Sequence, residues 1–122
     1  MRDKPNQASM VFGAATHISD EICWRPAADI YRTPRGWLVK CDLAGVKRED
    51  LEVTVRGSQI TISGLRRDWR LEDGCSHYSM EIAYNRFERT LKLPCDLDDA
   101  DIQIEAREGI LLVRLTCQGE EP

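Results

Sequence analysis

The sequence predicts an all-β protein, an antiparallel β-sandwich of about seven or eight short strands with little helix. Three observations lead to this prediction. Apolar and polar side chains alternate along most of residues 24–116, and a period of two places successive side chains on opposite faces of a strand. Turns rich in Gly, Pro and Asp separate the alternating runs. No stretch of about ten or more residues has the period of an amphipathic helix.

The chain of 122 residues fits a single domain, because compact domains mostly contain about 100 to 150 residues. We expect a flexible N-terminal arm at residues 1–23, a folded sandwich at residues 24–116 and a short tail at residues 117–122. The arm has no sustained period, and it contains one apolar patch, Met10-Val11-Phe12. A hydrophobic fraction of 42% and a charged fraction of 31% are typical of a soluble globular protein.

The first half of the predicted sandwich contains two alternating runs and a hairpin. One strand is expected at residues 37–44 and the next at residues 51–56. Gly57 then lies in an Arg-Gly-Ser turn, where glycine takes the positive φ that tight hairpins need, so residues 51–63 should form a hairpin. Residues 47–50 suit a single helical turn between the two strands.

The second half follows a polar connection at residues 65–77, which is long enough to be either mobile or functional. Alternation resumes at residues 78–84 and at residues 87–93, where Pro94 ends the run because it has no N–H for a ladder. Two further runs cover residues 102–106 and 110–115. In the last run we expect Leu111, Val113 and Leu115 to point inward, with the register set by a Glu108-Gly109 turn.

The charge balance indicates neither nucleic acid nor membrane as a partner. The net charge of -4 gives no electrostatic reason to approach a phosphate backbone or an anionic lipid surface. Arg66, Arg67 and Arg70 surround Trp69, but Asp68, Glu72 and Asp73 neutralise them, so we interpret this stretch as a solvated loop. The apolar run from Ile110 to Val113 is too short for a membrane span or a signal peptide. We therefore expect a cytoplasmic protein.

The five cysteines are scattered and odd in number, which favours reduced thiols over a disulfide framework. There is no Cys-x-x-Cys pair and there are only two histidines, so the sequence has little from which to build a zinc site. We interpret the thiols as small hydrophobic side chains.

The sequence shows no recognisable active site. Neither glycine-rich phosphate-binding pattern is present. Cys75-Ser76-His77 brings a thiol near an imidazole, but neighbours in a loop point in different directions, so we interpret it as an ordinary loop. The acidic run at residues 96–101 lacks the glycine and glutamate of a calcium-binding loop and suits turns instead. We therefore expect no enzyme activity, no cofactor and no metal.

Five stretches of sequence, in a fixed order, carry a family resemblance. They are WRPAADIY at residues 24–31, DLAGVKREDLEV at 42–53, ITISG at 60–64, EIAYNRFER at 81–89 and GIL at 109–111. Together they resemble the α-crystallin domain of bacterial small heat-shock proteins, which implies an immunoglobulin-like β-sandwich. The resemblance covers roughly residues 24–116, and five motifs in the right order are far more specific than any one of them.

The resemblance implies the function of an ATP-independent chaperone, a holdase that binds partly unfolded client proteins through exposed apolar surface and prevents their aggregation under stress. The Met10-Val11-Phe12 patch in the arm is a candidate client contact. Two alternatives remain open. One is a structural or scaffolding protein of the same fold that binds one dedicated partner, and the other is a co-chaperone that docks on a larger ATP-driven chaperone.

The resemblance also implies a dimer made by strand exchange, in which the long loop carries a strand that pairs with the partner's first strand. By that resemblance residues 78–84 are the exchanged strand and residues 29–32 are its acceptor. Pairing of this kind covers an edge that is otherwise prone to aggregation. The implied contact residues are Asp29, Ile30, Tyr31, Tyr78, Met80, Glu81, Ile82, Tyr84 and Arg89.

A groove between two edge strands is a further feature that the resemblance implies. In the family it accepts an isoleucine-x-isoleucine/valine segment from a neighbour. The matching residues here are Val53 and Val55 on one side and Ile102 and Ile104 on the other. From alternation alone the same four residues are equally well explained as core, so both interpretations stay open.

The sequence departs from the family pattern at four positions. Ala44 replaces a proline, Ile82 an arginine, Asn85 a glycine and Ile104 an alanine. Asn tolerates left-handed backbone, so we expect the turn at Asn85 to survive. With Ile82 in place of the family's arginine, we expect an apolar contact instead of a charged pair at the dimer contact. With Ile104 in place of the family's smaller alanine, we expect the strand assigned to the groove to be more crowded.

Residues 117–122 contain no isoleucine-x-isoleucine/valine segment. We therefore expect a dimer or small oligomer of the chain with itself, with a longer paralogue as a further partner, rather than a large assembly.

Overall fold

Seven strands and one short 3-10 helix make up the regular structure of the described residues, 24–68 and 72–117 of the computed structural model. In chain order they are β1 (Ala28–Thr33), β2 (Gly36–Asp42), η1 (Arg48–Asp50), β3 (Leu51–Arg56), β4 (Gln59–Arg66), β5 (Asn85–Lys92), β6 (Asp101–Arg107) and β7 (Ile110–Thr116). The strand content and the near absence of helix confirm the predicted all-β class, and η1 confirms the predicted helical turn.

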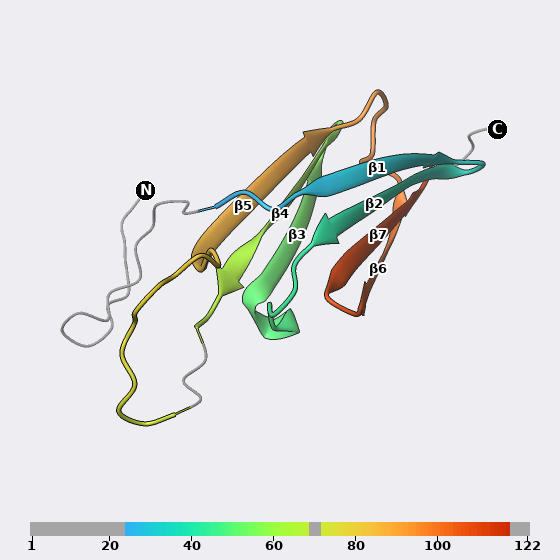
Figure 1. Ribbon diagram of the computed structural model, residues 1–122. Helices are drawn as coiled ribbons and strands as arrows, with labels where there is room; N and C mark the ends of the chain where they lie inside the picture. Colours follow the sequence, from blue (N-terminus) through green and yellow to red (C-terminus); the bar gives the residue numbers. More distant parts are fainter. Residues whose placement is uncertain (1–23, 69–71, 118–122) are drawn as a thin grey trace.

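The strands form two antiparallel sheets, one with the order β1-β2-β7-β6 and one with the order β3-β4-β5. Figure 1 shows the two sheets as the layers of a sandwich, with β1 and β5 along one side. The neighbours β1–β2, β3–β4, β4–β5 and β6–β7 are consecutive in the chain. Among the strands of the described residues, only β2 and β7 pair although they are not consecutive. This architecture confirms the predicted antiparallel sandwich.

The inward face of each sheet is set by its register, because residues directly opposite one another in a ladder project to the same face. In the larger sheet one inward row runs through Ile30, Val39, Val113 and Ile104. Val39 and Val113, on the two central strands, are fully buried. The smaller sheet covers them with Ile60 and Ile62 of β4 and with Phe87 and Leu91 of β5, all of which are buried.

The predicted turns have the expected backbone. Gly57 has a φ of 61° between β3 and β4, and Glu108 and Gly109 have φ values of 52° and 82° between β6 and β7. Positive φ at both central residues gives the twist that two adjacent antiparallel strands need. Asn85, at the start of β5, has a φ of 72°, so this residue keeps the left-handed turn predicted for it.

Two sequence-based boundaries need correction. The hairpin expected at residues 51–63 is longer, because β4 continues to Arg66 and pairs there with Asn85. Residues 78–84 alternate in sequence but belong to no strand of their own chain. Figure 1 shows this segment in the yellow loop that hangs away from both sheets, far from β1.

The left-handed backbone at Asn85 gives a direct test of the turn. Replacing Asn85 with Val should lower the free energy of unfolding by about 1–2 kcal/mol, because a β-branched residue is strained in this region. Replacing Asn85 with Gly should leave it unchanged or raise it slightly, because glycine adopts positive φ without strain. Urea unfolding followed by circular dichroism measures both variants, and equal stability of the two would contradict the assigned backbone.

Candidate partner-binding edges and loop

The first candidate site is the edge formed by β1. Within the described residues this strand pairs with β2 alone, so one side of its backbone faces away from the sheet. Ile30 is 39% exposed and Tyr31 is 43% exposed, on opposite faces of the strand. The Tyr31 ring lies near Lys40, whose Nζ donates to the Tyr31 hydroxyl at 3.2 Å. Asp29 is exposed beside them, so the predicted acceptor residues share one accessible edge.

The second candidate site is the loop that leads from β4 to β5. Its described part presents three large apolar side chains to solvent, namely Tyr78, Met80 and Ile82. They alternate along the chain, so they would share one face if the segment became a strand. Glu81 is exposed between them, and Tyr84 is half-buried where the loop returns to the sandwich. The structure therefore leaves Tyr78, Met80 and Ile82 of the predicted exchange segment exposed, outside both sheets of their own chain.

The start of the loop is fixed by an ion pair. Arg67 donates from Nε and Nη2 to both carboxylate oxygens of Asp50, at 2.9 and 3.0 Å. This two-point hydrogen bond is the main cause that lowers the pKa of Asp50 and raises that of Arg67. Asp50 was not among the acidic residues that the sequence analysis set against the loop arginines, and it reaches Arg67 because η1 lies beside β4.

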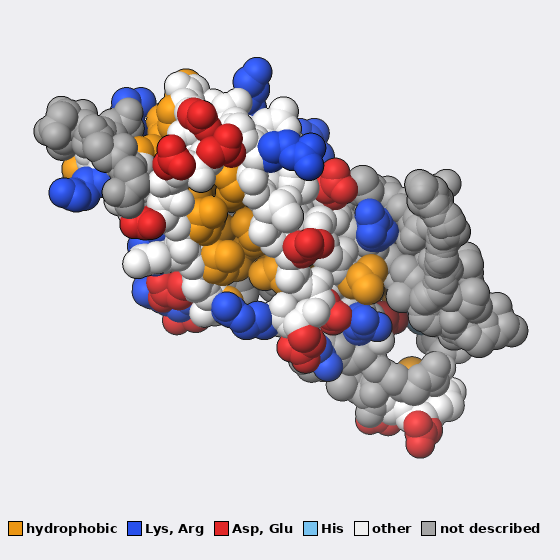
Figure 2. Space-filling view, turned by 180° about the vertical axis from the view of Figure 1, so that it is seen from behind, with side chains coloured by type: hydrophobic (Ala, Val, Ile, Leu, Met, Phe, Trp, Pro, Cys, Tyr) orange, Lys and Arg blue, Asp and Glu red, His pale blue; other side chains and the backbone are white. Residues whose placement is uncertain are grey.

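The third candidate site lies between the edge strands β3 and β6. The register places Ile102 and Ile104 on the inward face of β6, opposite the buried Leu115 and Val113, yet they are 42% and 36% exposed. Val53 and Val55 of β3 also face inward and are half-buried against the core. Figure 2 shows hydrophobic side chains gathered in a strip near the centre of the rear face, framed by charged residues.

A hollow of about 220 Å³ extends this strip at one end. Its walls include Leu51 at the start of β3, Ala106 at the end of β6, and Leu43, Val46 and Leu111. The hollow thus lies at one end of the candidate β3–β6 groove, the stretch between the two edge strands, and charged residues of both signs, Arg48, Arg107 and Glu108, border it.

Arg89, which the sequence assigned to the dimer contact, has a structural partner in its own chain. It faces inward opposite Ile62, and its Nη1 donates to the Pro26 carbonyl at 2.9 Å. Its Nε is buried and has no hydrogen-bond partner in the part of the chain that the structure describes. Arg89 thus holds the segment that leads into β1 against β5.

Several sequence candidates for chemistry have ordinary structural roles. The Cys75 Sγ donates to the Glu72 carbonyl at 3.1 Å, whereas His77 lies 3.4 Å from Asp68, so the thiol and the imidazole have separate partners. In the acidic run, Asp98 lies in a turn and its N–H donates to the Asp96 carboxylate at 3.0 Å, which confirms the interpretation of these aspartates as turn residues.

Cys41 behaves as a core residue. It is fully buried, and burial raises the pKa of its thiol to about 11, so the thiol stays protonated at neutral pH. No group of three His, Cys, Asp or Glu side chains able to hold a metal ion occurs among residues 24–68 and 72–117.

Met10, Val11 and Phe12, the client-contact candidates, lie outside the described residues. In the described part of the chain no helix is long and apolar enough to cross a membrane.

A family model described as Hsp20/alpha crystallin matches residues 29–122, which is most of the chain. The chain belongs to this family. The match begins at Asp29 in β1 and includes all three candidate sites.

Curated relatives of the chain are between 22% and 35% identical to it over the residues matched. Spore protein SP21 of Stigmatella aurantiaca is 30% identical over 95 residues, which are 78% of this chain and 56% of that protein. Alpha-crystallin of Mycobacterium tuberculosis is 35% identical over 85 residues, 69% of this chain and 56% of that protein. The chain therefore spans little more than half the length of these curated relatives.

Solved structures of the family share the fold. Heat shock protein 16.0 from Schizosaccharomyces pombe has a TM-score of 0.67 and 26% identity, and the match covers 81% of this chain and 96% of that chain. The hspA protein from Xanthomonas axonopodis has a TM-score of 0.64 and 26% identity, covering 78% of this chain and 95% of that chain.

The Asp50–Arg67 pair of this family member should make its stability depend on pH. Because the folded-state pKa of Asp50 lies below 3.8, its ordinary value, the carboxylate stabilises the fold above that value, and this stabilisation is lost as pH falls through the folded pKa. Asp50→Asn should therefore cost about 0.5–1 kcal/mol at pH 7 and less near pH 3.

Urea unfolding of both proteins at the two pH values measures this difference. Glu49→Gln, on the same helical turn, is the matched control and should change stability little at either pH. A cost of Asp50→Asn that stays the same at both pH values would contradict the assigned role of the pair.

Proposed function

We propose that the chain is an ATP-independent chaperone, a holdase that binds partly unfolded proteins and keeps them from aggregating. The observation that carries the proposal is that Ile102 and Ile104 lie on the inward face of the edge strand β6 and are nevertheless substantially exposed. Exposed apolar edges of this kind bind extended, apolar segments, which is what a partly unfolded client presents. Family membership supports the same function.

The β3–β6 groove is proposed as a client or partner site. An extended segment laid along the groove would bond its backbone to an edge strand and place alternate side chains against Val53, Val55, Ile102 and Ile104. Backbone bonding gives affinity that is independent of client sequence, which a general holdase needs. The Met10-Val11-Phe12 patch of the arm is proposed as a second apolar contact.

The working unit is proposed to be a dimer in which residues 78–84 of one copy pair with β1 of the other. The exposed and alternating Tyr78, Met80 and Ile82 support this, and so does the accessible edge of β1. The pairing would add one strand to each four-stranded sheet and cover apolar side chains that are exposed in a single chain. Ile82 would contribute an apolar contact there, and Glu81 would face outward from the added strand.

We propose a dimer or small oligomer as the assembly, in the cytoplasm, with unfolded proteins as the partners and a longer paralogue as a further one. No cofactor or catalytic group is needed, because binding alone delays aggregation.

The test is suppression of the thermal aggregation of a model client, followed by light scattering without nucleotide. The wild-type chain should suppress scattering at equimolar amounts, and Ile102→Ser with Ile104→Ser should lose most of this effect because the groove becomes polar. Both side chains are substantially exposed, so the thermal unfolding temperature should fall little.

Gln103→Ser is the matched control, since it lies between the two on the opposite face of β6. Equal suppression by the double variant and the control would overturn the groove as the client site. No suppression by the wild-type chain would overturn the holdase proposal. A pull-down that returns one stoichiometric partner would then favour a dedicated scaffolding role.

A further inference from the structure

Arg66 lies where four segments of the chain meet. It is the last residue of β4, and its backbone pairs with Asn85, the first residue of β5. Its Nε donates to the Ala83 carbonyl at 2.9 Å, and its Nη1 donates to the Ala44 carbonyl at 3.1 Å, in the turn after β2. One guanidinium group thus connects the end of β4 with the end of the loop and with the turn after β2.

Two aromatic rings flank the same guanidinium. Its central carbon lies 4.0 Å from the ring centroid of Trp24 and 6.0 Å from that of Tyr84. A planar guanidinium stacks on aromatic faces and donates in its own plane at the same time, which an ammonium group cannot do. Arg66, Trp24 and Tyr84 are all half-buried, so the stack is partly shielded from water.

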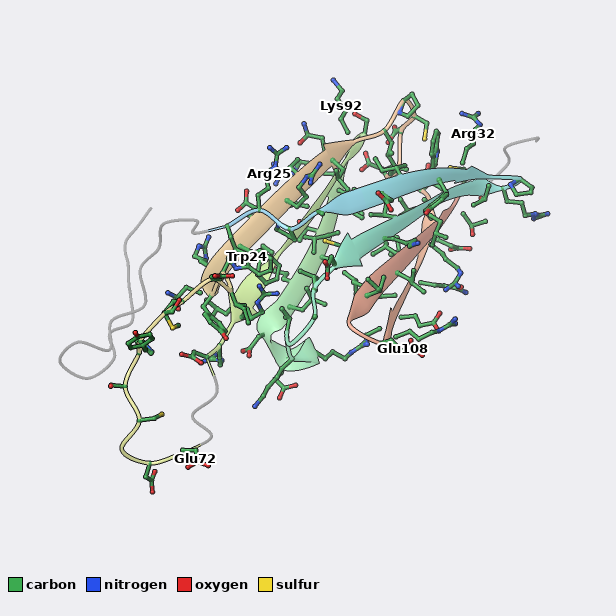
Figure 3. All side chains as sticks on the ribbon, in the orientation of Figure 1. Trp24, Arg25, Arg32, Glu72, Lys92 and Glu108 are labelled. Carbon is green, nitrogen blue, oxygen red and sulfur yellow. The ribbon has the colours of Figure 1, made fainter. Side chains whose placement is uncertain are left out.

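Trp24 is itself fastened to the start of β5. Its backbone N–H donates to the Arg86 carbonyl at 3.3 Å, and its indole Nε1 donates to the Asn85 carbonyl at 3.2 Å. Its ring also packs on Phe87, with centroids 5.1 Å apart. Figure 3 shows Trp24 at the ends of β4 and β5, where the loop leaves the sandwich, and Glu72 at the far end of the loop.

We propose that Arg66 is a positioning residue that sets the direction in which the 67–84 loop leaves the fold, and that it couples this direction to the segment entering at Trp24. The last ladder pair of the hairpin is Arg66 with Asn85, and the side chain of Arg66 extends the fixed region to Ala83. Ile82, the next residue outward, is 62% exposed beside a hollow of about 360 Å³. The part of the loop that Arg66 holds therefore begins at Ala83, and the exposed part of the loop ends at Ile82.

This position matters because of the proposed dimer, on which the second half of the inference rests. Residues 78–82 must reach another copy in one orientation, and a loop fixed at both ends samples fewer directions than one fixed only by Arg67. Loss of the stack should free the end of the loop and raise the entropic cost of ordering it in the dimer.

Arg66→Lys is the informative variant, because it keeps the charge and removes the planar fork. Arg114→Lys is the matched control, since the guanidinium of Arg114 also donates a hydrogen bond, to Glu105 at 2.8 Å, but lies on β7, outside the loop and outside the proposed dimer contact. Three readouts are needed: the indole N–H signal of Trp24 by NMR, cleavage of the 67–84 loop by thermolysin, and the dimer dissociation constant by sedimentation.

In Arg66→Lys the Trp24 indole signal should move, and loop cleavage and the dimer dissociation constant should each rise about tenfold. Arg114→Lys should leave the Trp24 signal, the loop cleavage and the dimer dissociation constant as in the wild type. Cleavage and dissociation equal to wild type in Arg66→Lys would overturn the inference and leave the chaperone proposal intact. A wild-type chain that never dimerises would overturn the proposed dimer, while the cleavage comparison would still decide whether Arg66 fixes the loop.

Discussion

The two sheets of the sandwich differ in strand number, and this difference determines which apolar side chains are covered and which stay exposed. A four-stranded sheet faces a three-stranded one, so the inward rows of the larger sheet are longer than the surface that covers them. On the central strands the inward residues Val39, Cys41, Leu111, Val113 and Leu115 are buried. On the outer strands β1 and β6 the same rows continue through Ile30, Ile102 and Ile104, which stay partly exposed. The two outer strands of the larger sheet therefore carry partly exposed apolar side chains, here called the apolar rims, because the facing sheet has one strand fewer.

Each rim coincides with a sheet edge, so apolar side chains and backbone groups that face away from the sheet occur together. Such edges attract other chains, and proteins usually cover or use them. The loop between β4 and β5 carries an alternating apolar segment with Tyr78, Met80 and Ile82 exposed, which would be the complementary element in the proposed dimer. Arg67 fixes its start through Asp50, and Arg66 fixes its end through Ala83. In the proposed dimer and client complex, the sandwich would support edges and a loop that other protein chains complete.

Local features of this architecture were predictable from sequence, whereas long-range contacts were not. Period-two alternation located most of the strands because it reports a local property, and the turns at Gly57 and Asn85 followed from residue chemistry. The strand order was not predicted, because alternation does not specify which strands pair. The partner of Arg67 was missed because η1 brings Asp50 close only in the folded chain. Alternation showed that Ile102 and Ile104 share one face of a strand, but it could not show whether that face is covered, because this depends on the number of strands in the facing sheet.

The central claim is that residues 78–84 of one copy complete the β1 edge of another. Amide hydrogen exchange across a range of protein concentrations tests it most directly. If the two segments pair, the β1 amides facing away from β2 and the amides of residues 78–84 should become protected together as dimers form, while the core amides of β4 and β7 stay unchanged. Rapid exchange of both segments at every concentration, in a chain that sediments as a dimer, would contradict it.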